Sequence, residues 1–354
     1  MYICAYFIIM KIIHTYLPTK NGAGINKLYM YSVALSVLLA KRYHEKVVIY
    51  TNDEFGDIIK KIGLPYDEIN TTILDGVECD TFSIPKLMVY AVQDEPYIHI
   101  DLDSFMYQKF DFFDDDTIQC AYGENFNGVI DSNGELNNFY NTYIDSTVHL
   151  KDKLPKEFLK HIKFNDVPNM SLFGVVDYEI VKKASKYCLN IYKNNTEFFD
   201  SNYYYACVIE QLFIPAAIRM LKEERKDKKD LRINFFMEEP NSITFLENQF
   251  EYPFNINTGK EKVYVSGEWD LFKNIMYNFG GYLHLNGFKN FDKIVFIIKQ
   301  RIMSDFEGYD YIKLIQNIFD EETECDGLTN SYFKHLKYHF QKMNANNILK
   351  KDLM

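Results

Sequence analysis

The sequence predicts an α/β fold with a mixed, mostly parallel central sheet flanked by helices. In the first third of the chain, short runs of β-branched and aromatic residues alternate with segments whose apolar residues recur at helical spacing. This alternation is typical of crossover connections, in which each helix joins two parallel strands and covers a face of the sheet. With 354 residues, 47% of them hydrophobic, the chain is long and apolar enough to bury such a sheet.

Periodicity and turn residues predict the elements of this first third. The expected strands are KIIHTY (11–16), KVVIYT (46–51) and YIHI (97–100). The expected helices span 26–43, 55–62 and 83–93. Pro85 falls in the first turn of the last helix, where its missing N–H costs nothing.

The rest of the chain is less regular. Residues 111–168 contain a stretch rich in Asn, Asp and Gly, which favours an exposed loop or hairpin region. Further helices are expected at 178–192 and 203–222, and short strands at 232–237, 243–246 and 262–265. After Gly287 the pattern is helical, so the simplest division is a catalytic-type domain at 1–287 and a helical C-terminal extension at 288–354.

Charge and cysteine content narrow the function classes. The net charge of −11 argues against broad nucleic-acid binding, because no basic surplus is present to neutralise phosphates. Six scattered cysteines without a CxxC pair are typical of a reducing compartment. The N-terminus lacks the basic region of a secretory signal, and no run approaches the ~18 apolar residues of a membrane span. We therefore expect a cytoplasmic protein, whose native start could be Met1 or Met10.

Two aspartates, Asp101 and Asp103, follow the apolar strand YIHI directly. In α/β sheets, ligands bind beyond the carboxyl ends of the strands, which is where this pair falls. Residues two positions apart on an extended chain point to one side with Cα atoms ~6.5 Å apart, so both carboxylates could bind one hard divalent cation. Alternatively, the aspartates only form a turn that ends the strand, and the pattern alone leaves both interpretations open.

Glu210 and Gln211 lie in an otherwise apolar helical segment, VIEQLFIPAA. A carboxylate buried there needs a partner, because burying an unpaired charge is costly. Glu210 could take a proton from an attacking hydroxyl or stabilise a positively charged reacting centre. The alternative is a carboxylate on the solvent-facing side of a helix.

Several motifs, taken in chain order, resemble those of GT-A glycosyltransferases. They are HTYLP, the helix carrying Lys86, YIHIDLDSFMYQKF, VPNMSLFG, IEQ and HLNGFK. The likeness covers residues 11–290 and is to poorly characterised microbial glycosyltransferase-like proteins and, more distantly, to the glycogenin and lipopolysaccharide galactosyltransferase family. It implies a GT-A, Rossmann-like fold, a nucleotide-sugar donor expected to be UDP-linked, and a Mn²⁺ or Mg²⁺ ion. It further implies sugar transfer to a hydroxyl of a glycan, lipid-linked or protein acceptor.

The same resemblance implies roles for individual residues. The metal ligands would be Asp103, Asp101 and His284, with Asp101 also within reach of the ribose. The nucleotide-sugar-binding residues would be Thr15, Tyr16, Lys86, Asp101, Asn169, Gly174, Gly287 and Lys289. Glu210 and Gln211 would be the catalytic pair beside the reacting sugar. Ser171 departs from the family pattern by replacing a glycine, and Lys289 arrives one residue early.

Other interpretations stay open. The departures at Ser171 and Lys289 are also compatible with a catalytically inactive protein that binds a nucleotide sugar or a glycan. A sugar nucleotidyltransferase is a third candidate, although the NGAG loop (21–24) lacks the basic residue and longer glycine pattern of that class. The tail at 330–351 interleaves basic and apolar residues and could contact a membrane surface or form a homodimer.

Overall fold

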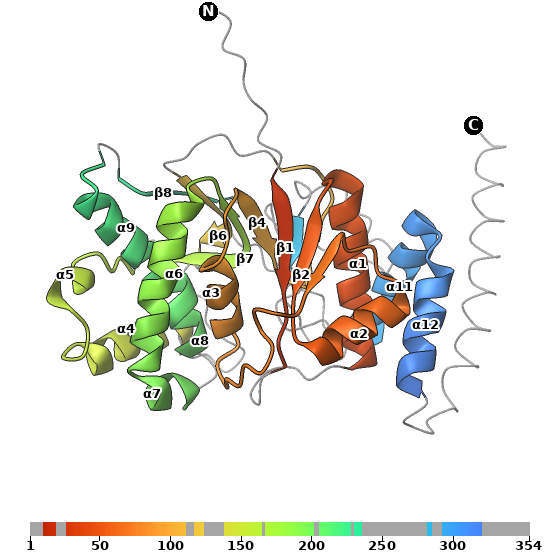
Figure 1. Cartoon of the computed structure of the whole chain (residues 1–354), viewed down its shortest axis with the longest axis horizontal. Coiled ribbons are helices and arrows are strands. Elements are labelled where there is room, and N and C mark those ends of the chain that lie inside the picture. The colour runs from red at the N-terminus through yellow and green to blue at the C-terminus, as the bar shows by residue number, and fades with distance from the viewer. Residues whose placement is uncertain are drawn as a thin grey trace, which may run out of the picture.

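The computed structural model of the chain describes residues 10–18, 26–110, 117–123, 138–164, 167–201, 205–227, 230–235, 282–284 and 292–320. Among these residues a seven-stranded sheet has the strand order β3-β2-β1-β4-β7-β6-β8, and β5 and β9 form a separate two-stranded sheet. Helices lie on both sides of the large sheet (Figure 1). The predicted mixed, mostly parallel α/β architecture is confirmed at this level.

Four parallel strands form one half of the large sheet: β1 (Lys11–Thr15), β2 (Val47–Tyr50), β3 (Glu68–Asn70) and β4 (Tyr97–Ile100). The chain moves outward from β1 to β3 and then returns to place β4 on the other side of β1. Strand order therefore reverses between β1 and β4. In open α/β sheets, ligands bind in the crevice outside the carboxyl ends of the strands at this kind of reversal.

The other half of the sheet is mixed. Its strands are β6 (Thr117–Gly123), β7 (Pro168–Val175) and β8 (Arg232–Phe235). β7 runs antiparallel to both β4 and β6, and β8 runs parallel to β6. Because β7 opposes β4, its first residues lie beside the carboxyl end of β4.

In the described part of the chain, the helices that cover one face are α1 (Lys27–Tyr43), α2 (Asp53–Ile62), α11 (Asp292–Phe306) and α12 (Tyr309–Asp320). Asn26 begins α1 by accepting a hydrogen bond from the Tyr29 N–H at 2.8 Å. Residues 29–40 of α1 are all buried, as expected for a helix that is apolar on every side. Figure 1 shows α11 and α12 on the outer side of α1, where Ile298 and Ile302 join the same hydrophobic cluster as Val33.

The other face carries the remaining described helices. They are α3 (Ile84–Tyr90), α4 (Asn138–Leu150), α5 (Lys156–Leu159), α6 (Tyr178–Lys193), α7 (Thr196–Asp200), α8 (Tyr205–Cys207), the π-helical turn η1 (Val208–Phe213) and α9 (Ile214–Glu224). A second hydrophobic cluster lies between these helices and the sheet. Among the helices of the described residues, none combines the length and the apolar character needed to cross a bilayer.

The described residues test the sequence expectations for the middle of the chain only in part. The Asn-, Asp- and Gly-rich stretch expected to be an exposed loop or hairpin (123–138) lies outside the described residues except at its two ends. β6 on one side of it, and α4 and α5 on the other, were not predicted. The single helix expected at 203–222 is interrupted by η1. The strands expected at 243–246 and 262–265, and the tail at 330–351, lie outside the described residues.

Candidate active site

The Asp101–Ser104 segment forms a turn at the carboxyl end of β4. The Ser104 N–H donates to the Asp101 carbonyl at 3.0 Å, which closes the turn. The Asp101 N–H donates to the Ser171 carbonyl of β7 at 2.8 Å and so ties the turn to the sheet. The Asp101 side chain is 22% exposed, and Asp103 is 6% exposed. The aspartates thus lie in a turn at the carboxyl edge of the sheet, with Asp101 partly exposed and Asp103 buried.

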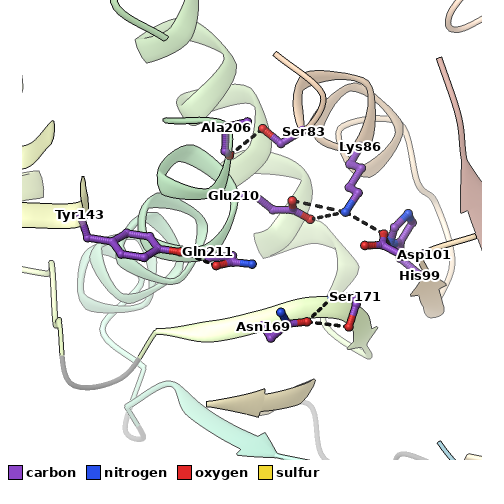
Figure 2. Close-up of polar contacts among 10 residues, drawn as sticks. All are labelled: Ser83, Lys86, His99, Asp101, Tyr143, Asn169, Ser171, Ala206, Glu210 and Gln211. Carbon is purple, nitrogen blue, oxygen red and sulfur yellow. Dashed lines mark hydrogen bonds and ion pairs between the residues drawn. The ribbon is translucent and has the colours of Figure 1, made fainter. Parts of the chain in front are cut away.

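A buried lysine lies between two carboxylates at this edge (Figure 2). The Lys86 Nζ is 2.7 Å from Asp101 Oδ1, and it lies 3.2 Å and 3.4 Å from the two carboxylate oxygens of Glu210. Lys86 is 9% exposed and Glu210 only 2%. Glu210 is therefore not a solvent-facing carboxylate, and its buried charge has the partner that it requires. With one cation and two carboxylates, the cluster carries a net negative charge when both carboxylates are ionised.

The pKa values in this cluster follow from burial and from the neighbouring charges. Burial raises the pKa of Glu210 to about 7, with the Lys86 charge opposing and the Asp101 charge reinforcing this shift. Burial alone would lower the pKa of Lys86, but the charges of Asp101 and Glu210 outweigh burial and raise it, so Lys86 stays protonated. Burial and the Lys86 charge hold the pKa of His99 well below its usual value, so His99 is neutral.

The π-helical turn η1 orients Glu210. Pro215 follows four residues after Gln211, lacks an N–H to donate to the Gln211 carbonyl, and would clash with that carbonyl in a regular α-helix. The widened turn avoids this clash, and π-helical turns often occur at functional sites. Glu210 faces Lys86, whereas Gln211 accepts a hydrogen bond from the Tyr143 hydroxyl of α4 (Figure 2). The two predicted catalytic residues thus have different partners.

Asn169 and Ser171 lie beside the aspartate turn at the start of β7. The Asn169 Oδ1 accepts hydrogen bonds from the backbone N–H of Ser171 at 3.0 Å and from its Oγ at 2.6 Å. Ser171, which replaces a glycine of the glycosyltransferase motif, thereby fixes the Asn169 side chain. Its carbonyl also accepts the hydrogen bond from the Asp101 N–H. Gly174 pairs with Ile98 of β4 and therefore lies inside the sheet, away from this edge.

Thr15 is the last residue of β1, on the other side of the strand-order reversal, and Tyr16 follows it. The Tyr16 ring is 7% exposed and packs against Phe55, with ring centroids 4.3 Å apart, and against Tyr29, with centroids 5.4 Å apart. Tyr29 was not predicted as a site residue. Burial, followed by the charge of Asp103, raises the pKa of Tyr29 well above its usual value, so a protonated hydroxyl accompanies the aspartate turn. The position of Tyr29 in the first turn of the helix after β1 could have indicated from the sequence that it lies near the site.

His284, the third metal ligand that the resemblance implies, lies beside the aspartate turn through its backbone. β5 (Ser104–Met106) pairs antiparallel with β9 (Tyr282–His284), and His284 stands opposite Ser104 in this register. Within the described side chains, no group of three His, Cys, Asp or Glu residues is arranged to hold an ion. Of the predicted ligands, the described side chains are the carboxylates of Asp101 and Asp103, which are oxygen ligands of the kind that hard divalent cations take, whereas only the backbone of His284 is described. Gly287 and Lys289 lie outside the described residues.

A groove of about 590 Å³ lies beside α7. Its lining includes His149, Lys153, Lys193, Asn195, Phe198 and Ser201. The Phe198 ring is sandwiched between the rings of His149 and Tyr205, at centroid distances of 4.6 Å and 4.3 Å. Thr81 and Ser83, which precede α3, donate hydrogen bonds to Asp200 and to the Ala206 carbonyl, so this region adjoins the carboxyl edge of the sheet. Figure 1 shows α7 and α8 together at the lower end of the view.

Comparison with known proteins gives a family and two distantly similar structures. No curated protein matches the chain by sequence. The structure is similar to the PaToxG glycosyltransferase, at 10% identity and a TM-score of 0.35, over 61% of this chain and 70% of that one. It is also similar to the glycosyltransferase GlyE of Streptococcus pneumoniae TIGR4, at 10% identity and a TM-score of 0.39, over 89% of this chain and 64% of that one. Residues 10–318 match the family described as "Family of unknown function (DUF6734)", and the chain therefore belongs to that family.

Proposed function

We propose that this protein is a metal-dependent glycosyltransferase of the GT-A type, which moves a sugar from a UDP-linked donor to an acceptor hydroxyl in glycan or glycoconjugate synthesis. The observation that carries the proposal is the buried Lys86 between Asp101 and Glu210, at the carboxyl edge where strand order reverses. A binding crevice is expected at this place in such a sheet. A partly buried cluster of unlike charges beside it is typical of a catalytic site.

On the donor side, Asp101, Asp103 and His284 would hold a Mn²⁺ or Mg²⁺ ion. Such an ion supplies positive charge that stabilises the diphosphate as it leaves the sugar. Because Lys86 already contacts Asp101 Oδ1, the ligands of the ion would be the second oxygen of Asp101 and the Asp103 carboxylate. Lys86 fixes the orientation of Asp101 and adds a positive charge near the leaving group. Thr15, Tyr16, Asn169, Gly287 and Lys289 would complete the donor site.

On the acceptor side, Glu210 is the candidate base. A carboxylate with a pKa near 7 can accept a proton at neutral pH and still has the driving force to do so. If Glu210 accepts the proton of the attacking hydroxyl, the anomeric configuration of the sugar inverts; if it stabilises the positive charge on the sugar, the configuration is retained. Nuclear magnetic resonance of the first product formed distinguishes these outcomes.

The direct test of the function is turnover of a panel of nucleotide sugars with Mn²⁺. Asp103→Asn removes a negative metal ligand, and we expect it to lower turnover by about 100-fold or more. Asp94→Asn is the matched control, because Asp94 precedes the opposite end of β4 and its side chain is 82% exposed. If no donor is bound or turned over by the wild-type protein with Mn²⁺, and Asp103→Asn changes nothing, the proposed function is wrong.

We further propose that the groove beside α7 binds the acceptor saccharide. Along α4, His149 lies six residues after Tyr143, or ~9 Å, and Tyr143 contacts Gln211 next to Glu210. Because both faces of Phe198 are covered, the aromatic surface for a ligand of the groove would be that of His149. An aromatic face with nearby amide, hydroxyl and ammonium groups suits a sugar, which offers both C–H faces and hydroxyls. Through α4 and the Tyr143–Gln211 contact, the groove is linked to the helical segment that carries Glu210.

His149→Ala is expected to raise the KM for the acceptor about 3- to 10-fold, since one stacking partner is lost, and to leave donor hydrolysis unchanged. Initial rates with a panel of mono- and disaccharide acceptors measure this. Val148→Ala, which changes the adjacent 66% exposed side chain outside the groove lining, is the control. An unchanged acceptor KM in His149→Ala would remove the groove from the proposal.

A further inference from the structure

The long buried helix α1 carries two serines whose hydroxyls leave the helix to bind the aspartate turn. The Ser32 Oγ donates to the Leu102 carbonyl at 2.9 Å, and the Ser36 Oγ donates to the Ser104 carbonyl at 2.8 Å. Both serines are buried and lie four residues apart, so they share one side of the helix. A serine inside a helix commonly bonds back to its own helix backbone. Here, instead, both hydroxyls hold the segment that contains Asp101 and Asp103.

Ser36 is also the end of a chain of hydrogen bonds that begins at Tyr66. The His14 Nδ1 is 2.8 Å from the Tyr66 hydroxyl, and its Nε2 is 3.4 Å from the Ser36 Oγ. His14 is fully buried, and burial lowers its pKa to about 3, so its ring is neutral and carries one N–H.

The chemistry of these groups fixes the direction of the chain. Ser36 uses its only hydroxyl proton on the Ser104 carbonyl, so toward His14 it can only accept. The single N–H of His14 is therefore on Nε2, and Nδ1 accepts from the Tyr66 hydroxyl. Each group thus donates toward the aspartate turn, from Tyr66 through His14 and Ser36 to Ser104.

The backbone of the turn is consequently held at four points. Besides the bonds from Ser32 and Ser36, the Asp101 N–H binds the Ser171 carbonyl and the Ser104 N–H closes the turn. The direction in which the Asp101 and Asp103 carboxylates point depends on this backbone. We infer that Ser32, Ser36, His14 and Tyr66 are positioning residues, which hold the Asp101–Ser104 turn in the geometry that binds the cation. This inference rests on the proposed function, because that function supplies the cation.

Deleting the hydroxyls of these positioning residues should weaken cation binding before it affects folding. For Ser36→Ala and Ser32→Ala we expect a 10- to 100-fold loss of Mn²⁺ affinity, the usual effect of deleting a group that orients a metal ligand. Tyr66→Phe removes only the distant hydroxyl and should cause a smaller loss in the same direction. Mn²⁺ titration followed by electron paramagnetic resonance measures the affinity without any substrate. Ser36→Thr, which retains the hydroxyl, should keep most of the wild-type affinity for Mn²⁺.

A second readout is independent of the metal. In the metal-free protein, hydrogen exchange of the peptide covering 101–106 should be faster in Ser36→Ala than in the wild type, because the turn opens more often. Ser185→Ala and Tyr97→Phe are the matched controls, since both side chains are fully buried and no hydrogen-bond partner for their hydroxyls is found among the described residues.

The outcomes separate this inference from the proposed function. If the wild type binds Mn²⁺ and Ser36→Ala binds it equally well, the inference is overturned and the proposed function stands. The inference is also overturned if exchange at 101–106 is unchanged, or if the controls lose as much affinity as Ser36→Ala. If the wild type does not bind Mn²⁺, the proposed metal dependence fails, and with it the role given to the four positioning residues.

Discussion

Lys86→Met is expected to destabilise the protein by about 3–5 kcal/mol and to abolish sugar transfer, because it leaves two carboxylates beside each other without their shared cation. Methionine has a similar length and fills the space, so the loss reflects charge more than packing. Denaturant unfolding measures the free energy, and donor turnover measures the activity. Lys183→Met, which changes an exposed lysine of α6, should alter neither.

The destabilisation by Lys86→Met should depend on pH. Without the Lys86 charge, the pKa of Glu210 in the folded protein should rise further above its unfolded value. A group with a raised folded pKa contributes stability below its unfolded pKa and loses it as pH rises through the folded pKa. The difference from the wild type should therefore be larger near about pH 8 than near about pH 5.

The double variant Lys86→Met/Glu210→Gln provides the internal check. It removes the buried carboxylate together with its partner, so it should be more stable than Lys86→Met alone and should lose most of the pH dependence. If Lys86→Met unfolds with the wild-type free energy at every pH, the buried cluster does not contribute to stability as the geometry indicates.

Glu210→Gln is expected to lower kcat by about 10²- to 10⁴-fold while leaving the KM for the donor little changed, if Glu210 is the base. In the wild type, the unprotonated carboxylate is the active form, so kcat/KM should rise with pH and level off above the Glu210 pKa of about 7. The rise attributable to this group should be absent in Glu210→Gln. Initial rates across pH measure both effects.

Glu224→Gln is the matched control, because it changes an exposed carboxylate near the end of α9. It should leave both kcat and the pH profile as in the wild type. A Glu210→Gln protein with near wild-type kcat would exclude Glu210 from catalysis. A loss of kcat with an unchanged pH inflection would assign the inflection to another group and favour charge stabilisation by Glu210.

Much of the secondary structure could be predicted because its signals are local. The strands at 11–16, 46–51 and 97–100 were recognised from β-branched runs, and all three are present. The interruption at η1 was missed although its cause, Pro215, is visible in the sequence, because the apolar spacing around it still reads as a continuous helix. The placement of Asp101 and Asp103 at a strand end could also be predicted, since it needs only the end of YIHI.

The sequence by itself determined the α/β alternation and the position of the aspartate pair, because periodicity and strand termination are written in neighbouring residues. Only the tertiary structure decided that Lys86 lies between Asp101 and Glu210, the latter 124 residues away, and that Ser36 reaches Ser104 across 68 residues. These contacts depend on the order and direction in which strands and helices assemble. No local pattern encodes that order, so the charge cluster around Lys86 and the hydrogen-bond chain from Tyr66 to Ser104 form only when the sheet is assembled.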